Sequence, residues 1–244
     1  MFEESVKNRG NLKLYSYNFN HNQCWYKDVC RNTCSDSCIR YMEMDYLLYH
    51  SQIPKKQQFP ISLIPEDKDY SNFVFLADIK DDIVDFVNSG ENLYITSQYT
   101  GNGKTTWSIK MMLKFFDTIW SGNGFRVRGV FIHVPTFLNK LKLDIKNPDI
   151  DFENLVSCLT NVDLVVWDDI ASTGLSSYDH SQLLTYIDQR VLSGKANIFT
   201  GNIPTKENLE KAVGRRLTSR IFSGEVVELK GRDRRLNGST ASIK

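Results

Sequence analysis

Lys104 and Thr105 stand at the end of a glycine-containing loop whose residue types suit the binding of phosphate groups. Residues 92–107 read NLYITSQYTGNGKTTW, which predicts a short strand, a loop and the start of a helix. In such a loop, backbone N–H groups bind an anion, the lysine contacts the outer phosphates and the threonine hydroxyl coordinates Mg²⁺. The residues expected to bind a nucleotide are Thr100, Gly101, Asn102, Gly103, Lys104, Thr105 and Thr106.

One position departs from the phosphate-loop pattern. The pattern G-x-x-x-x-G-K-[ST] begins with glycine, where this chain has Gln98. The alternative interpretation is a chance GNGKT in an ordinary turn between a strand and a helix. We favour the phosphate loop, because the flanking residues are those that the strand and the helix require.

Two carboxylates follow an apolar run further along the chain. Residues 163–170, DLVVWDDI, predict a buried parallel strand that ends at Asp168 and Asp169. Ligands of parallel α/β sheets bind at the carboxyl ends of the strands, so these acids are expected near the phosphate loop. Asp168 would hold Mg²⁺ together with Thr105, and Asp169 would polarise the attacking water.

An amide and two arginines complete the candidate chemistry. Asn202 follows the strand-like run 196–200, where it could contact water or the γ-phosphate, although asparagine is also common in ordinary turns. Arg216 and Arg220 share one helix face, either as surface cations or as phosphate contacts. Residues 206–235 hold nine Lys/Arg and five Asp/Glu, an excess of four positive charges that permits a basic face without establishing a nucleic-acid site.

Four of the five cysteines, Cys24, Cys30, Cys34 and Cys38, fall within fifteen residues. On one unbroken helix Cys30 and Cys38 would be about 12 Å apart, too far to share an ion, so the chain must bend, with a helix beginning near Ser37. Four thiolates around Zn²⁺ would stabilise so small a segment, and His21 could replace one of them. An iron–sulfur cluster and free structural cysteines are the alternatives.

These residues need a parallel sheet to position them. Strands are predicted at 127–134, 163–168 and 196–200, and helices at 78–88, after Lys104, near Pro135, at 152–160 and at 179–192. The fold class is therefore α/β, a phosphate-loop parallel sheet flanked by helices. A small N-terminal Cys-rich metal-binding module at 1–50 and a proline-containing linker at 51–75 precede this domain, which spans 76–244. The alternative for 51–75 is an extended arm that lies on the next domain.

Composition narrows the class of protein. The 244 residues are 41% hydrophobic and 24% charged, with a net charge of +1, which is typical of a globular protein in water. No apolar run is long enough to span a membrane, and the polar start MFEESVKNRG is unlike a signal peptide. We therefore expect a cytoplasmic protein without a membrane partner.

The segments SQYTGNGKT, DLVVWDDI, FTGN and GRRLTSRIFSG together resemble the nucleotide-site motifs of AAA+ ATPases. Their order and spacing are similar to those of the DnaC/DnaI-type helicase loaders, some of them phage-encoded, in which a cysteine-bearing zinc module precedes a compact ATPase core. By this resemblance, Lys104 and Thr105 are the Walker A residues, Asp168 and Asp169 the Walker B pair, Asn202 the sensor 1 residue and Arg220 the arginine finger, with Arg216 as an accessory.

The resemblance implies Mg²⁺-dependent ATP hydrolysis in DNA replication initiation. The ATPase domains would associate with one another, bind single-stranded DNA and help to load a DnaB-type replicative helicase, which the N-terminal module would bind. Two other functions stay open. One is a transposition regulator of the IstB type, and the other is a nonhydrolysing adaptor that combines a zinc module with a degenerate nucleotide site.

Overall fold

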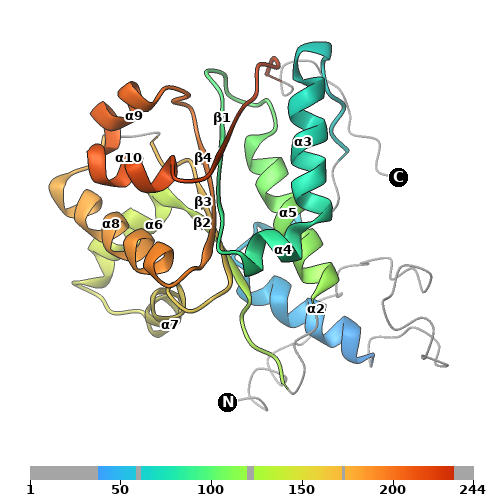
Figure 1. Cartoon of the computed structure of the whole chain (residues 1–244). Helices are drawn as coiled ribbons and strands as arrows, with labels where there is room; N and C mark the ends of the chain where they lie inside the picture. Colours follow the sequence, from blue (N-terminus) through green and yellow to red (C-terminus); the bar gives the residue numbers. More distant parts are fainter. Residues whose placement is uncertain (1–37, 59–61, 120–123, 172–173, 234–244) are drawn as a thin grey trace.

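A five-stranded parallel sheet forms the centre of the computed structural model, which describes residues 38–58, 62–119, 124–171 and 174–233 (Figure 1). The strands are β1 (Asn92–Thr96), β2 (Gly129–His133), β3 (Leu164–Asp168), β4 (Ala196–Gly201) and β5 (Glu225–Glu228). Their order is β2-β3-β4-β1-β5, and every pairing is parallel. The prediction of an α/β domain with a parallel sheet is therefore confirmed. Strand β5 was not predicted, because the short segment EVVE has charged ends and no distinct period.

Helices cover both faces of the sheet (Figure 1). One face carries α2 (Ile39–His50), α3 (Tyr70–Asp81), α4 (Ile83–Asn88) and α5 (Lys104–Thr118). The other carries α6 (Val134–Asp144), α7 (Ile150–Cys158), α8 (Ser177–Leu192), α9 (Lys206–Val213) and α10 (Arg215–Ile221). No helix within the described ranges is both long and apolar enough to cross a membrane.

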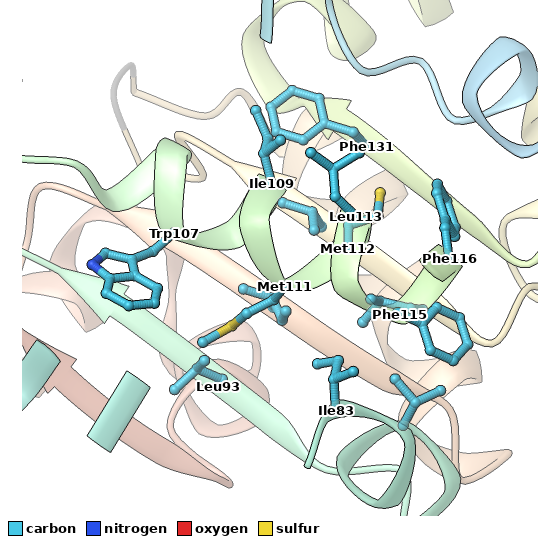
Figure 2. Packing of buried hydrophobic residues seen from close by; sticks show 14 of the residues in the cluster. Ile83, Leu93, Trp107, Ile109, Met111, Met112, Leu113, Phe115, Phe116 and Phe131 are labelled. Atoms are coloured by element: carbon cyan, nitrogen blue, oxygen red, sulfur yellow. The ribbon is translucent and has the colours of Figure 1, made fainter. Parts of the chain in front are cut away.

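The strands place alternate side chains in two hydrophobic cores. In β1, Leu93 and Ile95 belong to the core under α5, whereas Tyr94 belongs to the core on the opposite face. Helix α5 is the centre of the first core, and Figure 2 shows Met111 and Phe115 on the side of the helix that approaches Leu93 and Ile83. The burial of one such apolar side chain stabilises the fold by roughly 1.5–3 kcal/mol. The helix that follows the phosphate loop is therefore held rigidly against the sheet.

The segment before α4 differs from its predicted organisation. Helix α2 lies inside the predicted module 1–50, yet its Met44 and Leu47 are buried in the core under α5, and its Arg40 donates to the backbone of Phe116 and Asp117. Helix α3 begins at Tyr70, inside the predicted linker 51–75. Both segments pack on the domain because their apolar side chains are buried in the core under α5. The predicted helix at 78–88 is in fact two helices that meet at Asp82.

Residues 228–233, which we term the C-terminal segment, run from β5 to the phosphate loop. The buried carboxylate of Asp69 accepts hydrogen bonds from the backbone N–H groups of Lys230 and Gly231, at 2.6 and 2.7 Å. Glu66 accepts one from the N–H of Arg232 at 3.1 Å, and this bond lowers the pKa of Glu66. Two acids near the start of α3 therefore fasten the C-terminal segment beside the site described next.

Candidate nucleotide site

The loop between β1 and α5 has the backbone that its glycines permit. Gly101 and Gly103 have φ angles of +69° and +106°, in the left-handed region that favours glycine. The side chain of Asn102 donates to Ser97 Oγ and to the carbonyl oxygen of Leu229, the latter at 3.3 Å. Asn102 therefore points into the protein and ties the loop to the C-terminal segment. Its backbone N–H is the group that could bind phosphate.

Gln98 does not disturb this loop. Glycine is needed where φ is positive, and the described non-glycine residues with positive φ are Gln52 and Asp169. The backbone at position 98 therefore needs no glycine. The side chain of Gln98 lines a second cavity, of about 780 Å³, on the side of the loop that faces the C-terminal segment.

Lys104 begins helix α5 at the end of the loop. Its side chain is only 8% exposed, and Nζ donates to the carbonyl oxygen of Tyr99 at 2.8 Å and to Asn102 Oδ1 at 3.3 Å. The ammonium group thus lies over the loop, close to the helix N-terminus, whose partial charge is also positive. Both features favour the binding of an anion.

Asp168 ends strand β3 and lines the same cavity as Lys104. Its side chain is buried, and Oδ1 accepts hydrogen bonds from the hydroxyls of Thr105 at 2.8 Å and Thr200 at 2.7 Å. Burial raises the pKa of Asp168 above its ordinary value, although the two hydroxyls act in the other direction. Adjacent hydroxyl and carboxylate oxygens are the ligands that Mg²⁺ prefers, so Thr105 and Asp168 fit this ion.

Asp169 has an unusual backbone conformation for a residue with a side chain. Its φ angle is +62°, and its N–H donates to Thr200 Oγ1 at 3.0 Å. Non-glycine residues rarely adopt this conformation, which costs of order 1–3 kcal/mol and is concentrated at functional sites. Asp169 directly follows the last residue of β3. Its positive φ therefore gives the Asp169 carboxylate a different direction from that of a side chain on a continuing strand.

The predicted loop and strand-end residues surround one cavity of about 500 Å³. Its lining includes Thr100, Gly101, Asn102, Gly103, Lys104, Thr105, Thr106, Asp168, Asp169 and Asn202. Asn202 follows β4, and its buried Oδ1 lacks a hydrogen-bond partner among the described residues. This oxygen could accept a hydrogen bond from water or a ligand in the cavity. The prediction that residues at the carboxyl ends of parallel strands lie close together is therefore met by residues that follow or end three strands.

Three further residues line this cavity that the sequence interpretation missed. His133 ends β2, and its Nδ1 lies 2.8 Å from Thr136 Oγ1. Thr200 lies in β4 and bonds to Asp168, while Leu63 comes from the predicted linker. The rule that located Asp168 also applied to His133, because both residues end neighbouring parallel strands and are paired in register. Leu63 had no such signal.

Arg220 lies away from this cavity. Its carbonyl oxygen accepts a hydrogen bond from Asn92, the first residue of β1, whereas the phosphate loop follows Thr96, the last residue of that strand. Four residue steps at about 3.3 Å place these two ends roughly 13 Å apart. The Arg220 guanidinium pairs with Asp188 on α8, at 2.5 Å.

The predicted four-cysteine site falls mostly outside the described residues. Cys24, Cys30 and Cys34 lie there, so the site stays a prediction. Cys38 is described, and it is the N-cap residue of α2, close to the predicted helix start. Within the described residues, no group of three or more His, Cys, Asp or Glu side chains is arranged to hold a metal ion.

No protein-family model matches the sequence, and no functionally curated protein does. Solved structures do match. A structure of the DnaC helicase loader has a TM-score of 0.61 at 18% identity over 72% of this chain and 100% of that one. The chain shares the DnaC fold. A DnaI structure matches with a TM-score of 0.58 at 14% identity over 73% of this chain and 95% of DnaI.

The replication initiator DnaA, bound to AMPPCP and single-stranded DNA, is also similar. It matches 70% of this chain and 48% of its own length, with a TM-score of 0.54 at 16% identity. The predicted resemblance to DnaC/DnaI-type AAA+ proteins is therefore confirmed at the level of the fold. Within the DnaC fold, the cavity lies at the carboxyl ends of β1, β3 and β4.

We expect Asp168→Asn to raise the melting temperature at neutral pH. The pKa of Asp168 is raised in the folded protein, so the fold loses stability as the pH rises through the range between its unfolded and folded pKa values. Asparagine has no charge, and its amide oxygen can still accept from Thr105 and Thr200. Thermal melting without Mg²⁺ over a pH series measures the effect.

The gain in melting temperature should shrink at acidic pH, where wild-type Asp168 is protonated too. An Asp168→Asn protein that melts no higher than wild type at neutral pH would contradict this account of the buried carboxylate.

Proposed function

We propose that this chain is an ATPase of DNA replication initiation that helps to load a DnaB-type replicative helicase onto single-stranded DNA. The observation that carries the proposal is the convergence of Lys104, Thr105, Asp168, Asp169 and Asn202 on one cavity of a DnaC-like fold. A cation, a hydroxyl, two carboxylates and an amide around a phosphate loop are the groups that nucleoside triphosphate hydrolysis uses.

Each group has a role that its position supports. Lys104 and the N–H groups from Thr100 to Thr106 would bind the phosphates of ATP. Thr105 and Asp168 would hold Mg²⁺, which would neutralise charge on the phosphate oxygens. Asp169 would orient and polarise the attacking water, and the Asn202 amide would contact this water or the γ-phosphate.

Arg220 would act on nucleotide that a second copy of the chain binds. It lies at the opposite end of β1 from the phosphate loop, so it cannot reach the nucleotide of its own chain without a large rearrangement. A guanidinium contributed by a neighbour would stabilise charge developing on the γ-phosphate. Hydrolysis would then depend on self-association through the ATPase domains.

The other partners follow from the resemblance to the loaders. Cys24, Cys30, Cys34 and Cys38 would bind Zn²⁺ in the N-terminal module, and that module would bind the helicase. Helix α2, the described part of the predicted module 1–50, packs on the ATPase core. The basic residues of α9 and α10 are a candidate surface for single-stranded DNA.

The test uses the full chain in two measurements. Steady-state ATP hydrolysis is measured with and without single-stranded DNA, and we expect DNA to stimulate turnover. Affinity capture from the native cell should then recover a DnaB-type replicative helicase. Recovery of a transposase in its place would favour an IstB-type regulator. Nucleotide binding without hydrolysis under every condition would favour the adaptor and reject the proposal.

A further inference from the structure

Asp188 joins helix α8 to the two arginines that share a face of α10. Its Oδ1 accepts a hydrogen bond from Arg220 Nε at 2.5 Å, and its Oδ2 lies 4.0 Å from Arg216 Nη2. Helices α8 and α10 lie side by side on the same face of the sheet (Figure 1). One carboxylate on a neighbouring helix thus fixes where the Arg220 side chain lies.

The contact between Asp188 and Arg220 leaves most of the guanidinium available. Arginine has five N–H donors in one plane, and the contact occupies the donor on Nε. Among the described residues, Nη1 and Nη2 of Arg220 have no hydrogen-bond partner. The side chain is therefore anchored at its inner nitrogen and presents its outer nitrogens, which are the pair that suits two oxygens of a phosphate group.

A contribution to folding stability does not by itself explain the ion pair between Asp188 and Arg220. The side chains of Arg220 and Asp188 are 35% and 22% exposed, and ion pairs near the surface contribute little to folding stability. Orientation is a stronger reason. A long arginine side chain loses rotamer freedom when it binds, and a side chain that is already held loses less.

We propose that Asp188 is a positioning residue for Arg220, which holds the guanidinium ready for the γ-phosphate of nucleotide bound by a neighbouring copy. This inference rests on the proposed function, in which Arg220 acts in trans. Asp188 does not touch the nucleotide and acts only through Arg220. Arg216 is a weaker second partner of the same carboxylate.

Asp188→Ala should lower the kcat of ATP hydrolysis about 10- to 100-fold, the size expected for a misplaced group, while the KM for ATP and self-association stay unchanged. Asp188→Glu, which keeps the carboxylate, should recover much of the activity. Glu210→Ala is the matched control, because Glu210 on α9 lies 4.0 Å from Arg215 of α10, so its loss removes an equal charge beside the same helix. It should keep wild-type turnover.

A double-mutant cycle separates this proposal from the proposed function. If Asp188 acts only through Arg220, adding Asp188→Ala to Arg220→Ala should lower kcat no further. Wild-type turnover of Asp188→Ala beside an inactive Arg220→Ala would overturn the positioning role and leave the arginine finger intact. A faster Asp188→Ala protein would also overturn it, since Asp188 would then restrain Arg220. Wild-type turnover of Arg220→Ala would reject both ideas.

Discussion

Lys104→Ala is expected to lower ATP hydrolysis at least about 100-fold, because preorganised charged contacts to transferring phosphates are worth this much or more. Nζ lies over the phosphate loop, and no other lysine lines the cavity among the described residues. Nucleotide affinity should fall as well, since the same charge meets the phosphates before reaction. Fluorescent-nucleotide titration and steady-state hydrolysis measure the two effects separately.

The fold of the Lys104→Ala protein should persist, because the side chain contributes little to either hydrophobic core. A circular dichroism melt close to that of wild type verifies this point. Lys114→Ala is the matched control, since Lys114 lies on the same helix outside the cavity. Wild-type ATP binding and hydrolysis in a folded Lys104→Ala protein would rule out the phosphate-loop assignment.

Arg220→Ala should lower hydrolysis by about 1,000-fold in the assembled protein, in line with arginine fingers supplied by a partner. ATP binding should stay close to wild type, because Arg220 lies far from the loop of its own chain. Arg126→Ala is the control, since the Arg126 side chain is 58% exposed and lies outside the cavity and outside α9 and α10.

Mixing two inactive proteins tests whether Arg220 acts in trans. When Lys104→Ala and Arg220→Ala subunits exchange, some interfaces join an intact phosphate loop to an intact arginine. Partial ATPase activity should therefore return. No recovery under conditions of proven subunit exchange would contradict action in trans. Unimpaired hydrolysis by Arg220→Ala alone, with DNA and partner present, would remove Arg220 from the reaction altogether.

Local patterns predicted most of the residues that line the cavity, for a physical reason. Parallel strands bring their carboxyl ends to one edge, so Asp168 and Asn202 could be placed near Lys104 without knowledge of the strand order. The same reasoning should have included His133. The phosphate loop was recognisable because its glycines and its lysine must be adjacent in sequence.

Contacts between distant segments could not be predicted in this way. Asp69 binds the backbone of Lys230 and Gly231, about 160 residues away, and nothing in the local sequence marks it as a partner. Nothing in the local sequence marks Asp188 of α8 as a partner of Arg220 either. Leu63 and Phe73 likewise pack against surfaces that exist only after the sheet has formed, so local sequence could not show these contacts.

The order of the strands has a consequence for synthesis on the ribosome. Strand β1 carries the phosphate loop and is made first, yet its two neighbours in the sheet are the last two strands, β4 and β5. The hydrogen bond between Asn92 and Asn197 joins residues 105 positions apart in the chain. The hydrogen bond between Asn102 and Leu229 joins residues 127 positions apart. Pairing over such separations is slow. We therefore expect nascent chains that end before β5 to be unable to retain nucleotide, so ATP can stabilise this fold only after that strand has emerged.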